Sequence, residues 1–153
     1  MNEHLTSFVA QEKSIQALQR SLAVLPAGTS LVRVHPDFPL APMMPGRFEP
    51  CYDDNMTVEG PLRFTARFWV CGGDGHTNAQ AMLDRWREWE WDVYDSAENG
   101  RDTTRVVSPD GCKVILQLSM DGHLSIGVSS PCFPFENGEN LDDPGAPETI
   151  GRR

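Results

Sequence analysis

The segment Cys71-Gly72-Gly73-Asp74-Gly75-His76 contains the residue types best suited to chemistry in this chain. Cys71 would need His76 as a base to act as a thiol nucleophile, and glycines before a helix can bind an anion through backbone amides. The segment has neither the lysine nor the spacing of a phosphate-binding loop, and its motif supplies no third group to orient His76. We therefore interpret it as a strand-to-helix connection and predict no catalytic residue and no enzymatic activity.

The remaining histidines, His4, His35 and His123, are far apart and form neither an H-x-x-x-H nor an H-E pattern. The cysteines lack the close pairing that is typical of structural zinc sites. The acidic residues near positions 53–59 and 88–92 show no EF-hand order. The sequence thus predicts no metal site and no other cofactor.

Aromatic residues offer a candidate binding surface. Trp86 and Trp89 fall with Met82 on one face of a helix expected from residue 78 to about 90, so we place them in the core. Trp69 and Trp91 lie off the main apolar stripes, and tryptophan is enriched at binding hot spots. We predict a binding patch formed by Trp69, Trp91, Tyr94 and His76.

Four segments are expected before that helix. Apolar residues at three- and four-residue steps predict a first helix over 2–25, with Phe8, Ile15, Leu18, Leu22 and Leu25 on its buried face. A short strand at 29–35 and a proline-rich loop at 36–50 follow. Alternation over 62–71 predicts a half-buried strand whose outer face carries Arg63, Thr65, Arg67 and Trp69.

A four-strand meander is expected over residues 92–134. The turn signals Pro109-Asp110-Gly111 and Asp121-Gly122 separate runs of β-branched residues, and Asn99-Gly100 adds a third turn. Strands that follow segregated helices indicate an α+β fold. We predict an antiparallel sheet of this meander plus one or two further strands, with two helices packed on one face.

Composition limits the classes of protein. The 153 residues suit one domain, predicted over 1–135, followed by a flexible acidic tail over 136–153. A net charge of −9 disfavours nucleic acid and anionic lipid as partners. No apolar run is long enough to cross a membrane.

The four cysteines bear on the compartment. Cys51, Cys71, Cys112 and Cys132 are widely spaced and lie near expected strand ends, which favours disulfides and an oxidising, extracytoplasmic setting. The N-terminus MNEHLTSF lacks the basic start and apolar core of a signal peptide. The expectation is therefore either a cytoplasmic protein or a mature chain that begins at a new methionine.

Three segments together resemble a group of small actinobacterial lipoproteins of unknown function, including the mycobacterial LppA-like proteins. They are AMLDRWREWEWDV (81–93), SPDGCKVILQLS (108–119) and GHLSIGVSSPCF (122–133). The resemblance extends over residues 14–135, includes Leu25-Pro26-Ala27-Gly28 and Cys51, and is most specific at 124–132. It implies the same helix, strand, helix and meander order and offers no catalytic motif. The leader and lipid-attached cysteine of that group are missing here.

The resemblance also implies a disulfide pairing. In that family the central and last cysteines look like partners, which suggests Cys51 with Cys132 and leaves Cys71 with Cys112. A local alternative joins Cys112 to Cys132, because a turn at Asp121-Gly122 places residue 112 opposite 131. That pairing needs a bulge, since an offset of one residue points the two side chains to opposite faces. We predict the pairing implied by the resemblance.

These expectations describe a non-enzymatic, extracytoplasmic, disulfide-bonded domain of a cell-envelope lipoprotein, which binds an unknown envelope protein or ligand. A phage- or element-encoded copy acting in exclusion or immunity is one form. A lipid anchor absent from this chain would supply any membrane contact. One alternative is a cytoplasmic small-ligand binder or enzyme that uses the turn from Cys71 to His76. Another is a secreted effector or inhibitor that binds through its acidic surface and tryptophans.

Overall fold

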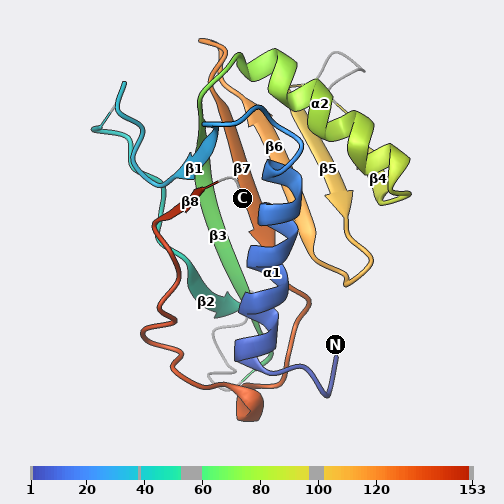
Figure 1. Cartoon of the computed structure of the whole chain (residues 1–153). Coiled ribbons are helices and arrows are strands. Elements are labelled where there is room, and N and C mark those ends of the chain that lie inside the picture. Colours follow the sequence, from blue (N-terminus) through green and yellow to red (C-terminus); the bar gives the residue numbers. More distant parts are fainter. Residues whose placement is uncertain (1, 38, 53–59, 97–101, 152–153) are drawn as a thin grey trace.

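The computed structural model describes residues 2–37, 39–52, 60–96 and 102–151. Its helices and strands are, in chain order, α1 (Ser7–Leu22), β1 (Ser30–Val32), β2 (Arg47–Pro50), β3 (Leu62–Cys71), α2 (Gly75–Glu88), β4 (Asp92–Asp95), β5 (Thr103–Val107), β6 (Lys113–Leu118), β7 (Leu124–Ser129), the short 3-10 helix η2 (Phe135–Asn137) and β8 (Thr149–Gly151) (Figure 1).

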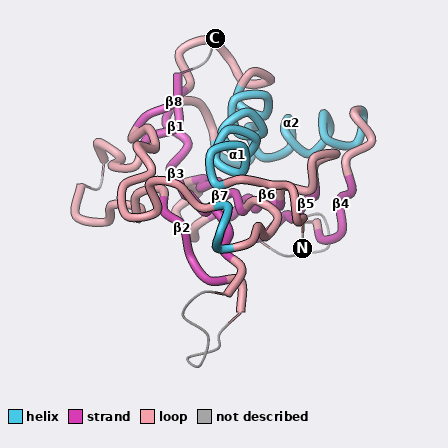
Figure 2. Tube along the Cα trace, turned by 90° about the horizontal axis from the view of Figure 1, so that it is seen from below, coloured by secondary structure: helices cyan, strands magenta, loops and turns pink. Residues whose placement is uncertain are grey.

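The strands form one antiparallel sheet in the order β4-β5-β6-β7-β3-β1-β8. On the free edge of β3, β2 pairs with its first half and β1 pairs with its last residues. Both helices pack on the same face of the sheet (Figure 2). The predicted α+β class with an antiparallel sheet is therefore confirmed.

The meander is also confirmed, since β4 to β7 pair in sequence. Gly111 and Gly122 occupy the left-handed region with φ of 82° and 80°, as their turns require. The predicted turn at Asn99-Gly100 lies outside the described residues. The longest described strand is β3, whose bounds match the predicted strand and whose Phe64 and Phe68 are almost fully buried. Each such side chain stabilises the fold by roughly 1.5–3 kcal/mol.

The predicted buried face of α1 is partly wrong. Leu18 and Leu22 are buried, but Phe8 is 67% exposed. Small residues, among them Ser14 and Ser21, form much of its buried face. Each of these serines donates its hydroxyl to the carbonyl four residues earlier at 2.8 Å. With their polar groups satisfied, serines pack like small apolar residues and let the helix approach the strands closely.

The prediction of a flexible tail over 136–153 is wrong for its described part. β8 pairs with β1, and Ile150 is buried in the core. The chain between η2 and β8 runs along α1. There, Ser7 Oγ donates to Glu139 O (3.0 Å) and Gln11 Nε2 donates to Pro144 O (3.0 Å). β1 would otherwise expose an unpaired edge next to an apolar surface, which a short strand can cover at low cost.

One disulfide is present, and it is Cys51–Cys132, as the resemblance implied. It joins the end of β2 to the segment after β7. The predicted Cys71–Cys112 disulfide is wrong, since both residues are free thiols. Cys71 ends β3 beside Ser30, whereas Cys112 precedes β6 at the opposite end of the sheet. The antiparallel register thus separates the two sulfurs by most of the length of a strand.

Candidate functional site

The face of the sheet opposite the helices carries a mixture of basic, small polar and aromatic side chains. In one row across the strands, Trp69 stands beside Ser125 and Gln117, and in the next row Arg67 stands beside Gly127. Paired positions project to the same side of a sheet, so these residues share a surface. A pocket of about 280 Å³, here called the Arg67 pocket, is hollowed there; it is lined by Met43, Arg67, Trp69, Gln117, Leu118, Ser119 and Ser125.

Gly127 makes room for the arginine stem. A β-carbon at this residue would lie 3.6 Å from Arg67 Cγ and only 3.1 Å from Ile115 Cγ2. A side chain at this position would therefore press on Ile115 and stand in contact with the Arg67 stem. Arg67 is half-buried although it lies on the open face.

Arg67 lacks the carboxylate partner that four other described arginines have, although Arg33 Nε, like Arg67 Nε, is buried without a hydrogen bond. Four neighbouring arginines have carboxylate partners: Arg33 with Glu148 (3.4 Å), Arg47 with Glu49 (3.4 Å), Arg63 with Glu49 (2.9 Å) and Arg105 with Asp95 (2.6 Å). Within the described ranges, Arg67 Nε is buried and has no hydrogen-bond partner. Burial lowers the pKa of the guanidinium from its ordinary value, although arginine stays charged at neutral pH.

Met43, in the loop between β1 and β2, lines one side of the Arg67 pocket. Trp69 Nε1 donates to Ala41 O at 3.0 Å. Met43 N donates to Arg33 O (2.8 Å), and Arg33 Nη1 donates back to Met43 O (2.9 Å). These bonds hold Met43 at the pocket rim. The pocket is therefore lined by a cation (Arg67), an aromatic ring (Trp69) and a thioether (Met43).

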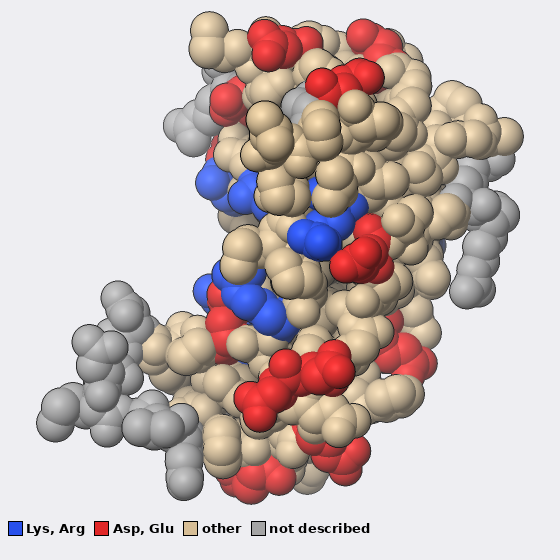
Figure 3. All heavy atoms as spheres, turned by 90° about the vertical axis from the view of Figure 1, so that its left-hand side faces the viewer, with Lys and Arg blue, Asp and Glu red and all other residues tan. Residues whose placement is uncertain are grey.

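The charge around this region contrasts with the acidic whole. Figure 3 views the molecule from the side of β1, β2 and β8, where Lys and Arg side chains gather at mid-height and acidic side chains lie beside, above and below them. The outer-face arginines predicted on β3, Arg63 and Arg67, are on this part of the sheet. A local cluster of basic side chains is therefore present although the net charge of the chain is −9.

The four predicted patch residues do not form one surface. Trp91 is buried, at 6% exposure, and stacks on Trp86 with ring centroids 6.3 Å apart. Glu90 adopts a left-handed backbone with φ 62°, and Trp91 N then donates to Trp86 O, which folds the indole back under α2. Its inclusion in an exposed patch is wrong.

Tyr94 and His76 are exposed but lie away from Trp69. Tyr94 is on the edge strand β4, four strands from β3, which is roughly 19 Å at the usual strand spacing. His76 is in the first turn of α2, against Gly122. Only Trp69 of the predicted patch therefore belongs to the Arg67 pocket.

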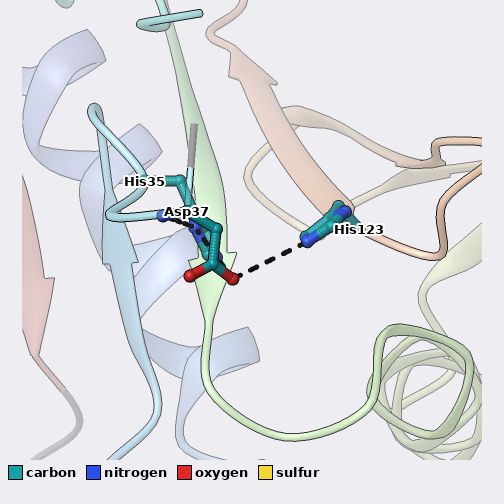
Figure 4. Close-up of side chains that lie close together, drawn as sticks. All are labelled: His35, Asp37 and His123. Carbon is teal, nitrogen blue, oxygen red and sulfur yellow. Dashed lines mark hydrogen bonds and ion pairs between the residues drawn. The ribbon is translucent and has the colours of Figure 1, made fainter. Parts of the chain in front are cut away.

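A second pocket, here called the His35 pocket, lies at the end of β3 and the start of β7 and also measures about 280 Å³. His35, Asp37 and His123 lie close together in it (Figure 4). Asp37 Oδ2 is 3.8 Å from His35 Nδ1 and 3.9 Å from His123 Nε2. The two imidazole rings meet edge to face with centroids 5.4 Å apart. Asp37 thus lies between the two histidines.

Cys71 lines the His35 pocket, whereas His76 is exposed on the helix that follows. Gly72 and Gly73 have positive φ of 114° and 71°, and Asp74 caps α2 by accepting from Thr77 N at 2.9 Å. That cap holds the pKa of the Asp74 carboxyl below its usual value. The hydrogen bonds between described residues include none from Cys71 to His76. The segment has the geometry of a capped strand-to-helix turn.

Sequence reasoning missed the His35 pocket, because it treated His35 and His123 as scattered. β1 and β7 pair with β3 on its two sides. The end of β1, which His35 follows, therefore lies near the start of β7, which His123 precedes. The local signals were the His35-Pro36-Asp37 tripeptide after a strand and His123 directly after the Asp121-Gly122 turn. Neither signal identifies its partner without the strand order.

No protein family, curated protein or solved structure matches this chain. Among the described residues, no helix is long and apolar enough to cross a membrane.

Proposed function

We propose that this protein is a non-enzymatic, extracytoplasmic binding domain whose ligand site is the Arg67 pocket. The observation that carries the proposal is the half-buried guanidinium of Arg67, whose Nε is buried and has no hydrogen-bond partner within the described chain. Burying part of a charged group without a partner costs free energy, and an anion bound to the same guanidinium would offset that cost. Four other described arginines, Arg33, Arg47, Arg63 and Arg105, each contact a carboxylate, and Arg47 and Arg63 share that of Glu49.

The chemistry of the pocket favours an oxyanion attached to a planar or apolar group. Arginine binds carboxylate and phosphate through paired hydrogen bonds. Trp69 and Met43 add an aromatic face and a polarisable thioether beside the charge. Gln117 and Ser125 supply neutral hydrogen-bonding groups on the same face. A partner protein that presents a carboxylate next to an aromatic side chain would fit the same features.

The proposed compartment is supported by the Cys51–Cys132 disulfide, because such bonds persist in oxidising settings. The resemblance to actinobacterial envelope lipoproteins points to the same compartment and to an unknown envelope protein or ligand as partner. The alternative, a cytoplasmic binder or enzyme using Cys71 and His76, gains no support from the capped turn between them.

A titration with small probes tests the site. N-acetyl-phenylalanine carries a carboxylate and a ring, its amide lacks the charge, and inorganic phosphate lacks the ring. We expect saturable binding of N-acetyl-phenylalanine by calorimetry, weaker binding of phosphate and none of the amide. Arg67→Met should weaken the binding by about 10–100-fold, which corresponds to the 1.5–3 kcal/mol of a charged hydrogen bond.

Arg63→Met is the matched control. Arg63 lies on the same face of the same strand but is paired with Glu49 at 2.9 Å. The control should bind N-acetyl-phenylalanine like the unaltered chain. Equal loss in both variants would mean that general positive charge attracts the probe. Binding that survives Arg67→Met, or a failure of all three probes to bind, would reject the proposed site.

A further inference from the structure

We propose that His35, Asp37 and His123 bind a divalent transition-metal ion, with Zn²⁺ as the expected ion. Nδ1 or Nε2 of each histidine and one oxygen of Asp37 lie within 4.8 Å of one another. Two imidazoles and a carboxylate are the donor set of many zinc centres. Imidazole nitrogen disfavours Ca²⁺ and Mg²⁺, which prefer oxygen ligands.

The histidine orientation suits a ligand role. His35 is buried, at 7% exposure, and its Nδ1 accepts a hydrogen bond from Asp37 N at 3.0 Å. Nδ1 therefore carries the lone pair, and it is turned toward the carboxylate side of the pocket. His123 presents Nε2 to the other side of the same carboxylate. The three donor atoms thus come from two separate segments of the chain and lie within 4.8 Å of one another.

Modest movement would bring the donors to bonding distance. In a tetrahedral zinc site with bonds of about 2.0–2.1 Å, neighbouring ligand atoms are about 3.3 Å apart. The Asp37 oxygen already lies 3.8 and 3.9 Å from the two nitrogens. Asp37 is 71% exposed and His123 is 34% exposed, so both side chains can rotate inward without disturbing the core. His35 would exchange the Asp37 amide for the metal.

Three protein ligands leave one coordination position for water or another ligand. Cys71 lines the same pocket but is not among the three clustered donors. The ion would join the segment after β1 to the turn before β7. Because Met43 and Ala41 belong to that same segment, the ion would also fix one wall of the Arg67 pocket. Metal binding itself is independent of any ligand in that pocket.

Calorimetric titration of the full, disulfide-intact chain with Zn²⁺ alone tests the site. We expect one saturable site, and a rise in melting temperature of roughly 5–10 °C at a Zn²⁺ concentration about 100 times the Kd. His123→Ala should weaken Zn²⁺ binding by about 100-fold or more, because even outer-shell partners are worth 10–100-fold. His35→Ala should do the same, and His123→Ala remains informative if the buried substitution prevents folding.

Controls separate this site from other ligands. His4→Ala removes an exposed histidine far from the cluster and should leave the affinity unchanged, as should Cys71→Ser. The Co²⁺-loaded chain should show no thiolate charge-transfer absorption. The absence of saturable Zn²⁺ binding, or binding that His123→Ala leaves intact, overturns the proposal. Loss of binding in Cys71→Ser would overturn it too, because the site would then be a thiolate site.

Discussion

At the scale of single residues, the two free cysteines occupy different environments. Cys112 is fully buried, with Ser14 Oγ 4.0 Å from its sulfur, and burial raises the pKa of its thiol above the usual 9.0. Cys71 is only partly buried at the end of β3. The thiolate is the reactive form of cysteine. Alkylating agents should therefore modify Cys71 in the native protein well before Cys112.

The raised pKa of Cys112 predicts a loss of stability in alkali. Above about pH 9, the unfolded chain releases the Cys112 proton while the folded chain retains it. The free energy of unfolding therefore falls as the pH rises. The contribution is fully present below the unfolded pKa and is lost as the pH rises toward the folded pKa. Urea unfolding at about pH 8 and about pH 10 measures the change.

Cys112→Ala provides the comparison, in a Cys71→Ser background that prevents thiol exchange. The drop in the free energy of unfolding between the two pH values should be smaller in Cys112→Ala than in its parent. An identical drop in both chains would show that other groups cause the alkaline destabilisation.

Residue positions were predictable where strand alternation alone decides them. Arg67 and Trp69 are on the outer face of β3, as the alternation indicated. Trp91 was misplaced because a single left-handed residue, Glu90, reverses the chain after α2, and glutamate gives no sequence signal for that conformation. The nearness of His35 to His123 depends on strand order, which local patterns do not contain.

At the scale of elements, long periodic segments were predictable and short ones were not. β3 and the meander have clear alternation and turn signals. The buried face of α1 was misassigned because serines form much of it, and a hydrophobicity pattern counts serine as polar. β8 has three residues in a polar segment, so its pairing with β1 comes from tertiary context.

The role of β8 gives a prediction. Ile150→Ala should lower the free energy of unfolding by about 2–5 kcal/mol, because the side chain is 4% exposed and its removal leaves a cavity. Thr149→Ala, an exposed neighbour on the same strand, should change it by less than about 0.5 kcal/mol. Urea unfolding measures both. Equal and negligible effects would mean that the C-terminal segment does not pack on the sheet in solution.

At the scale of the whole molecule, one covalent link joins distant parts of the chain. Cys51 and Cys132 are 81 residues apart, and their bond fixes β2 and the end of the meander beside the start of β3. Cys51→Ser with Cys132→Ser should cost about 2–4 kcal/mol of stability, mainly because the unfolded chain gains conformations. Chemical denaturation of the double variant measures this.

The thiol count is the matching control. Mass spectrometry after alkylation in denaturant should find two modified cysteines without reductant and four with it. Cys71→Ser with Cys112→Ser should retain the disulfide. Four alkylated cysteines in the purified, unreduced protein would contradict both the disulfide and the proposed extracytoplasmic setting.

The open sheet face is the feature on which the proposed function depends most. NMR titration of the full chain with N-acetyl-phenylalanine would locate its binding surface directly. We expect the amide signals of residues around Arg67, Trp69, Ser125 and Gly127 to shift together and to saturate, with α1 and β4 unaffected. Unchanged spectra, or shifts confined to the helical side of the sheet, would contradict a ligand site in the Arg67 pocket.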